Sequence, residues 1–276
     1  MEDRSNDRHD PESSAGSPPE PVGAPVGAPV ALQSAPMMTG ASDAVEPQLT
    51  LLEHLEELRD RLIKSLIAVA ITSTISVIFA WQIIRILFVP LGSLQDRVIS
   101  LELTETITTY FHVALYSGLT LAMPIILYQT IMFIAPGLTS REKRLMLSWL
   151  PAVIFAFLGG VLFSYFLVVP AAVQFLLTFG QGVVNQQVIF GNYISTVISL
   201  MFWIGVVFEL PIFLLVLSKL GIVSHQRLSS LRKYAIVAAV LIAAVITPTP
   251  DPFNQMLVAL PIILLYELGI VLSRWL

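Results

Sequence analysis

The stretch that decides the fold is Thr50–Leu62, TLLEHLEELRDRL, a charged segment that ends where the first long apolar run begins. On a helix, one narrow face would carry leucines and the opposite faces would carry acids and bases, because helical side chains recur every 3.6 residues. Thr50 and Glu53 match a capping box, in which each side chain bonds the other residue's backbone N–H. We therefore predict a short, acidic, interfacial helix before the membrane. Its apolar face consists of Leu51, Leu55, Leu58 and Leu62.

The composition predicts an integral membrane protein. Hydrophobic residues make up 55% of the chain and charged residues only 12%, with repeated apolar runs of membrane-spanning length. The chain contains no cysteine, which excludes disulfides and thiolate chemistry. Its four histidines are scattered, so we expect neither a metal site nor a cofactor.

The charges are divided unevenly along the chain. Residues 1–60 contain 12 of the 19 acids and three bases, whereas the remainder carries 12 bases and seven acids. Residues 1–48 are rich in Pro, Ala, Ser and Gly, include the repeat PVGAPVGAPV, and have too few large apolar residues to build a core. We predict a disordered acidic tail over 1–48 and a membrane domain over 49–276. The acidic start, without an apolar region, argues against a cleaved signal peptide.

Six apolar segments predict six transmembrane helices and an all-α fold. The fifth is short: Tyr234–Thr247 would give about 21 Å of helix against a hydrocarbon core of about 30 Å. Such a mismatch would thin the bilayer locally. The approximate limits are 64–84, 106–135, 145–169, 193–218, 233–247 and 253–273.

The distribution of Lys and Arg predicts the topology. If both termini are cytoplasmic, 13 of the 15 bases lie inside and only Arg85 and Arg97 lie outside. Loops that contain Lys and Arg resist translocation, so this arrangement is strongly favoured.

Proline and small residues predict how the helices pack. Four spans carry prolines that remove a backbone donor and kink a helix, which suggests a curved, concave bundle. These are Pro124, Pro151, Pro211 and Pro261. A stripe of small residues at four-residue spacing in the third span would let another helix approach closely. It comprises Ala152, Ala156, Gly160 and Ser164. In the first outer loop, Pro90 is expected to break a short helix.

Nothing in the chain indicates an enzyme. The spans contain no GxSG, no HExxH and no aspartate pair, and His54 has no second histidine at metal-ligand spacing.

Glu209 is the notable ionisable residue within a span. It lies ten residues before Lys219, about 15 Å into the membrane, where an ionisable group is costly and often functional. The structural alternative, which is compatible with a functional role, is a protonated carboxyl hydrogen-bonded to a neighbouring helix.

Two further acids lie at the inner surface among bases. Glu57 and Glu142 could together hold a dibasic ligand through forked, charge-assisted hydrogen bonds. Each also has a structural explanation. Glu57 can pair with Arg61 at i, i+4, and Glu142 can form a capping box with Thr139.

Five motifs follow one another along the chain: HLEELRDRL from His54, ILYQTIMFIAPGLTSREKRL from Ile126, FELP from Phe208, TPTPDPFNQ from Thr247 and LYELG from Leu265. In this order they resemble the TatC family, the polytopic subunits of the twin-arginine protein translocase. The resemblance covers about residues 49–276 and implies a six-helix, cup-shaped receptor for twin-arginine signal peptides of folded cargo. It also implies assembly with TatA and possibly TatB, as a homo-oligomer in a receptor complex, and transport driven by the proton motive force across a bacterial or archaeal plasma membrane.

Matched by motif, the resemblance implies roles for seven residues. Glu57, Glu142 and Phe133 would form the signal-peptide site, and Glu209 would face the concave side and engage a TatA-type helix. Pro90 would shape the outer cap, and Asp251 with Gln255 would belong to the outer end of the last helical hairpin.

The alternative function is a proton-coupled secondary transporter that uses Glu209. Such folds are built from internal repeats with broken helices in matching positions. The sequence shows no such symmetry, and the acidic opening helix would have no role in a transporter.

Overall fold

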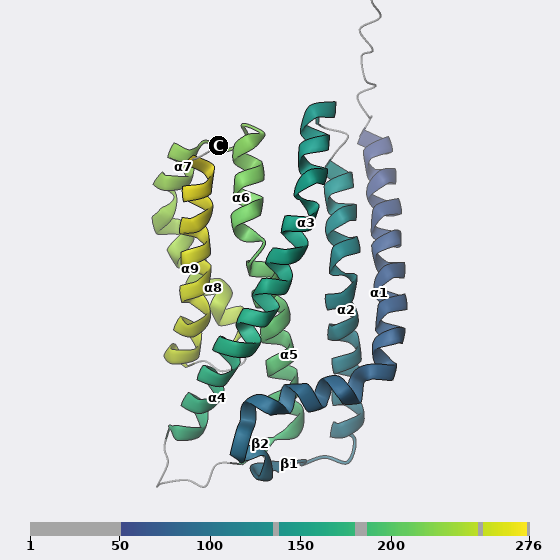
Figure 1. The fold of residues 1–276 in the computed structure, drawn as a ribbon, viewed down its shortest axis with the longest axis vertical. Coiled ribbons are helices and arrows are strands. Elements are labelled where there is room, and N and C mark those ends of the chain that lie inside the picture. The colour runs from purple at the N-terminus through teal and green to yellow at the C-terminus, as the bar shows by residue number, and fades with distance from the viewer. Residues whose placement is uncertain (1–50, 135–137, 180–186, 248–250, 275–276) are drawn as a thin grey trace, which may run out of the picture. The chain divides into compact units, whose positions relative to one another are not determined.

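The computed structural model describes residues 51–134, 138–179, 187–247 and 251–274. The predicted tail over 1–48 and the capping residue Thr50 lie outside the described residues. The described part is nearly all helical (Figure 1). Its elements are α1 (Leu51–Phe88), the 3-10 helix η1 (Val89–Arg97), β1 (Val98–Ile99), α2 (Glu105–Ile134), α3 (Ser140–Phe163), the π-helix η3 (Ser164–Val168), α4 (Val169–Thr178), β2 (Val188–Ile189), α5 (Phe190–Val207), α6 (Leu210–Lys219), α7 (His225–Ser230), α8 (Arg232–Ile246) and α9 (Pro252–Arg274).

Among the described residues, five helical runs are long and apolar enough to cross a membrane. The remaining predicted segment, 233–247, forms α8, which has only 15 residues. At the helical rise this is about 22 Å, shorter than a hydrocarbon core of about 30 Å. All six predicted segments are therefore helical, and the shortness of the fifth is confirmed. The five runs are Glu53–Gly92, Glu105–Ile134, Ser140–Thr178, Phe190–Lys219 and Pro252–Arg274.

The helices run alternately between two ends of the bundle. We call the end at which α1 and α3 begin the charged end, and the end at which α2 and α5 begin the far end. Figure 1 shows that α9 finishes at the charged end, where α1 starts. There, Arg232 of α8 forms a 3.1 Å ion pair with Glu267 of α9, and the Tyr266 hydroxyl donates to the Leu228 carbonyl at 2.8 Å.

The first two spans pack tightly along their length. A Cβ atom at Gly118 of α2 would come within 2.4 Å of the Ser73 Cα of α1, so only glycine fits there. The Thr72 hydroxyl of α1 also donates to the Gly118 carbonyl at 2.7 Å. Lipid is as apolar as the side chains of membrane helices, so the hydrophobic effect does not drive these helices together. They associate instead through close packing of their backbones. These contacts make α1 and α2 a tightly joined pair.

The small-residue stripe in α3 meets α5 at Gly160. A Cβ atom there would come within 2.8 Å of the Gly205 Cα and 2.7 Å of the Phe208 ring. Ser164, which begins the π-helix η3, is also fully buried. Ala152, in contrast, is exposed. The predicted close approach is therefore confirmed for the later half of the stripe only.

The far end is closed by the last turns of α1 and by η1. Leu87, Leu91 and Ile194 are almost completely buried in one core cluster that joins α1, α2, α4 and α5. The Tyr193 hydroxyl of α5 donates to the Leu87 carbonyl at 2.7 Å. A two-stranded parallel sheet adds to this closure, with Val98 paired to Val188 and Ile99 to Ile189.

Proline acts differently at different positions. Pro124, Pro151 and Pro261 lie inside continuous helices. Pro211 follows a true break, because α5 ends at Val207 and α6 begins at Leu210. Proline cannot donate to the carbonyl four residues earlier, which here is Val207. A further proline, Pro170, is the second residue of α4, two positions after the π-helix Ser164–Val168 ends. The missing donor at Pro170 is consistent with the wider turn before it.

We expect Gly160→Ala to destabilise the protein. Its new methyl group would overpack the contact with Gly205 and Phe208, at a cost of about 1 to 3 kcal/mol. Thermal unfolding of the purified protein in detergent measures this. Gly159→Ala is the matched control, because a Cβ atom at Gly159 meets nothing within 4 Å. Equal melting temperatures for the two variants would contradict the close α3–α5 contact.

Candidate binding site at the charged end

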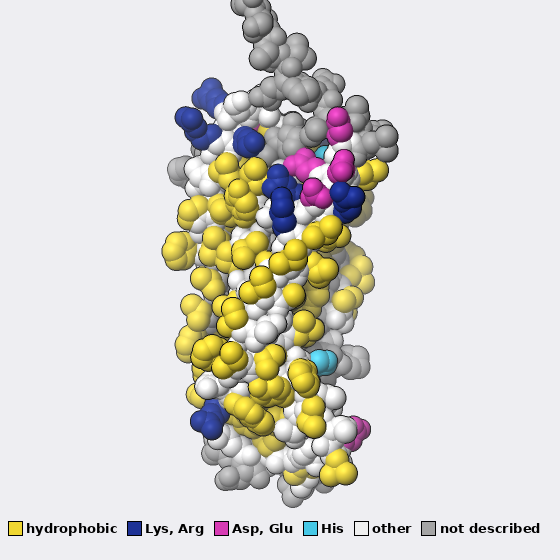
Figure 2. All heavy atoms as spheres, turned by 90° about the vertical axis from the view of Figure 1, so that its right-hand side faces the viewer, with side chains coloured by type: hydrophobic (Ala, Val, Ile, Leu, Met, Phe, Trp, Pro, Cys, Tyr) yellow, Lys and Arg dark blue, Asp and Glu magenta, His cyan; other side chains and the backbone are white. Residues whose placement is uncertain are grey.

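Charged side chains gather at the charged end of the molecule. Figure 2 shows acidic and basic groups together there, and hydrophobic side chains over the middle of the same face. Arg59 contacts both Glu56 and Asp60 at 3.3 Å, but all three side chains are more than half exposed. Such pairs contribute little to stability because solvent screens them.

A more enclosed cluster joins α1 to α2. The Arg61 guanidinium donates to Glu57 Oε1 through Nη2 at 2.9 Å and through Nε at 3.3 Å. Its Nη1 donates to Gln129 Oε1 of α2 at 3.1 Å. Only 21% of the Arg61 side chain and 20% of the Glu57 side chain are exposed. The i, i+4 pair expected from the sequence is therefore confirmed, and a third residue from α2 completes it.

Phe133 lies in the same region of the α1–α2 pair. Its ring stacks on His54 of α1, with centroids 4.5 Å apart and planes 18° from parallel. One turn separates His54 from Glu57 on α1, and one turn separates Phe133 from Gln129 on α2. The stacked rings and the Glu57–Arg61–Gln129 cluster are thus neighbours along the same two helices.

Glu142 caps the start of α3. Its Oε2 accepts hydrogen bonds from the Thr139 backbone N–H and hydroxyl, both at 2.8 Å, and the Thr139 side chain accepts from the Glu142 backbone N–H. The predicted capping box is confirmed. No hydrogen bond or ion pair joins Glu142 to Glu57 among the residues described. Glu142 is only half-buried, so its carboxylate is held in place yet accessible.

Glu209 occupies the break between α5 and α6. Its Oε1 is buried and accepts no hydrogen bond from any described residue. Phe208, beside it, packs against Phe163 with ring centroids 5.3 Å apart. A carboxyl oxygen buried without a donor is costly, so the position suits an incoming polar group.

The three residues that the resemblance assigns to the outer side, Pro90, Asp251 and Gln255, lie at the far end. Pro90 lies at the start of η1, directly after α1 ends. Both Asp251 carboxylate oxygens accept hydrogen bonds from Asn254, from its backbone N–H at 2.7 Å and from its side-chain amide at 2.9 Å. The Gln255 amide donates to the Val240 carbonyl of α8 at 3.1 Å, which ties α9 to α8.

Glu105 organises the far end, and the sequence reading missed it. One carboxylate oxygen accepts from the Gly191 backbone at the start of α5 at 2.5 Å. The other accepts from the Ser100 hydroxyl at 2.8 Å and the Leu101 backbone at 2.7 Å. The sequence did contain a signal for Glu105, because an acid in the first turn of a helix is favoured by the helix dipole. Likewise, Gln129 stands out as a polar residue in an apolar run.

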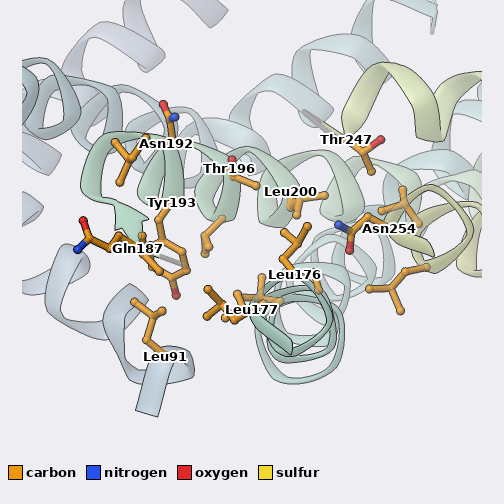
Figure 3. Close-up of a pocket in the computed structure, with 18 residues that line it drawn as sticks. Leu91, Leu176, Leu177, Gln187, Asn192, Tyr193, Thr196, Leu200, Thr247 and Asn254 are labelled. Atoms are coloured by element: carbon orange, nitrogen blue, oxygen red, sulfur yellow. The ribbon is translucent and has the colours of Figure 1, made fainter. Parts of the chain in front are cut away.

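A cavity of about 460 Å³ lies elsewhere in the described part of the molecule. Figure 3 shows Tyr193, Thr196 and Leu200 of α5 opposite Leu176 and Leu177 of α4. None of the described residues that line it is charged, and none of them is among the seven predicted site residues. Among the described residues there is also no cluster of three His, Asp or Glu side chains that could hold a metal.

Comparison with known proteins identifies the family. The family model for the Sec-independent protein translocase protein (TatC) matches residues 53–261. The chain belongs to the TatC family. The TatC protein of Deinococcus radiodurans is 43% identical over 232 residues, which cover 81% of this chain and 85% of that protein. The Aquifex aeolicus TatC protein is 42% identical over 228 residues, or 81% of this chain and 94% of that protein.

Solved structures agree with this assignment. Two crystal structures of the twin-arginine translocase receptor TatC match with a TM-score of 0.74 at 41% identity, covering 80% of this chain and 98% or 99% of theirs. As a TatC family member, the protein is a multi-pass membrane component of Sec-independent protein translocation. That is a transport role with no indicated catalytic activity, and it gives no support to a secondary transporter.

Proposed function

We propose that this protein is the receptor subunit of the twin-arginine translocase. It binds the consecutive arginines of signal peptides on folded cargo at the charged end, which faces the cytoplasm. It assembles with TatA, and with TatB where one exists, in a homo-oligomeric receptor complex, and transport across the plasma membrane is driven by the proton motive force.

The single observation that supports this most is the cluster of Glu57, Arg61 and Gln129 beside Phe133. Glu57 already accepts two hydrogen bonds from one guanidinium, so its position suits forked recognition of arginine. An arginine fork matches a carboxylate better than the point charge of lysine does. The adjacent aromatic ring offers a face on which a guanidinium or an apolar side chain can rest.

Glu142 supplies the second carboxylate of the proposed site. Two hydrogen bonds from Thr139 hold it at the start of α3, where the positive end of the helix dipole also stabilises an anion. Its capping role and its binding role are compatible, because a carboxylate has about four acceptor positions.

The proposed orientation follows from the bases. Arg141, Lys143 and Arg144 lie in the first turns of α3 at the charged end, whereas Arg85 and Arg97 lie near the far end. Six crossings, with α8 as the short one, would return the chain to the side on which α1 starts. Both termini are then cytoplasmic.

We expect this topology to be visible by cysteine labelling, because the natural chain has no cysteine. Leu103→Cys, at a fully exposed position of the far end, should react with an impermeant maleimide added to intact cells. Ser140→Cys should react only after the membrane is opened. Labelling of position 140 in intact cells would contradict the proposed orientation.

We expect Glu57→Gln to weaken binding of a twin-arginine peptide by about 10- to 150-fold. A hydrogen bond to a charged group contributes about 1.5 to 3 kcal/mol, and each 1.4 kcal/mol is tenfold in affinity. Glu142→Gln should weaken it as well, and added salt should weaken binding to the unmodified protein. Fluorescence anisotropy with a labelled peptide and detergent-solubilised protein measures these affinities.

Glu56→Gln is the matched control for these substitutions. It removes the same charge one residue away, from an exposed side chain that pairs with the exposed Arg59 at 3.3 Å. Its effect should be small. If both Glu57→Gln and Glu142→Gln bind the peptide normally while folded and inserted, these acids have only their pairing and capping roles.

We further propose that Glu209 is a polar docking point for a TatA-type helix, separate from the arginine site. Glu209→Ala should leave insertion and peptide binding intact and reduce crosslinking to the partner helix by about 3- to 20-fold. This follows from interhelical hydrogen bonds of about 0.6 to 1.7 kcal/mol in membranes. Glu209→Gln should retain more activity than Glu209→Ala if hydrogen bonding, rather than charge, is what the partner needs.

Thr196→Ala is the control for Glu209, since it removes a polar group from α5 at a distant position that lines the cavity of Figure 3. It should leave crosslinking near position 209 unchanged. Equal loss of peptide binding and transport in Glu209→Ala would show that the two roles are not separate.

A further inference from the structure

The carboxylate proposed to bind signal peptides is already occupied by an arginine of the same chain. Arg61 directs two of its nitrogens to Glu57 Oε1, at 2.9 and 3.3 Å. This is the contact that a signal-peptide arginine would make. The pair is about four-fifths buried on both sides, so solvent screens it less than the exposed Arg59 pairs.

Gln129 holds the arginine in this position. Its Oε1 accepts from Arg61 Nη1 at 3.1 Å, so the guanidinium spans from α1 to α2. Lysine could not make this arrangement, because a single ammonium cannot present a planar fork to one acceptor and a third donor to another. The occupation of Glu57 seen here therefore requires an arginine at position 61.

We propose that Arg61 is an internal competitor for Glu57, which lowers the affinity of the site for every cationic ligand. This rests on the proposed function of Glu57 in signal-peptide binding. A ligand binds Glu57 only in the fraction of molecules in which Arg61 has released it. The apparent dissociation constant is the intrinsic one divided by that fraction.

Competition explains why two arginines would be needed. A ligand with one guanidinium exchanges one arginine–carboxylate contact for an equivalent one, so the exchange is close to neutral. A second guanidinium that reaches Glu142 adds a contact that Arg61 does not make. The favourable free energy of binding then comes mainly from this second contact. Specificity is raised by opposing weak ligands as well as by attracting the correct one.

The test is the affinity of Arg61→Gln for two peptides that differ only in carrying consecutive arginines or consecutive lysines. Both affinities should rise by about 3- to 30-fold. This range corresponds to losing a contact whose strength lies between that of an exposed ion pair and that of a hydrogen bond to a charged group. The ratio of the two affinities should stay the same, because release of Glu57 is a cost common to both ligands. The measurement uses full-length protein in lipid nanodiscs.

Arg61→Lys provides a second variant that keeps the charge and the apolar stem. Because its ammonium is a weaker competitor for the carboxylate, both affinities should rise by less than in Arg61→Gln. If Arg61→Gln is not recovered from membranes, this variant decides the question alone. A fall or no change in affinity in Arg61→Lys would then overturn the proposal.

Lys64→Gln is the matched control. It removes a positive charge from α1 one turn later, at an exposed side chain that makes no ion pair with a described residue. It should change the affinities much less than Arg61→Gln does. An equal gain in both variants would show that general charge, and not occupation of Glu57, limits binding.

The remaining outcomes separate this proposal from the one on which it rests. In the double variant Glu57→Gln/Arg61→Gln, the gain in peptide affinity should disappear, because the carboxylate for which Arg61 competes has been removed. If Arg61→Gln weakens binding, the arginine orients Glu57 and does not compete for it. If Glu57→Gln weakens binding but Arg61→Gln has no effect, only the competition is wrong. If Glu57→Gln has no effect, the proposed binding role of Glu57 fails.

Discussion

Hydrocarbon offers no hydrogen bonds to a polypeptide backbone, and this constraint shapes every element of the structure. The 38 residues of α1 and the 30 of α2 satisfy their backbones within each helix. Among the described residues, the spans depart from the α-helix at the π-helix Ser164–Val168 and at the Phe208–Glu209 break. In the π-helix, Ser164 and Val168 are 0% and 2% exposed, whereas Phe166 and Leu167 are 65% and 57% exposed; at the break, Phe208 packs on Phe163. Each departure from the α-helix therefore rests on other helices along one of its faces.

Close packing of backbones sets the positions of the functional groups. Gly118 brings α2 against α1, and Gly160 brings α3 against α5. Since α1 carries Glu57 and α2 carries Phe133, their relative placement depends on the same helix pair that Gly118 joins. The proposed binding site, built on two tightly packed helices, would need little reorganisation of its backbone to receive a ligand.

Three glutamates lie in three different environments, and each environment suits its proposed role. Glu57 is paired and four-fifths buried, Glu142 is capped and accessible, and Glu209 has a buried oxygen that no described residue satisfies. In the proposed function, the first two would each present a carboxylate to an arginine of the signal peptide. The third would gain from a partner that enters the membrane. The structural contacts of these side chains are therefore compatible with the proposed binding roles.

Local features followed from the sequence because they depend on neighbouring residues. These include the six helical segments, the short α8, the Thr139–Glu142 capping box and the Glu57–Arg61 pair. The five motifs also indicated the family. Tertiary structure alone decided which distant groups meet: Gln129 with Arg61, Glu105 with Gly191, and His54 with Phe133. It also paired Glu267 of α9 with Arg232 of α8. Periodicity reports which face of a helix is apolar, but contacts between helices depend on their rotation and depth, which packing alone determines.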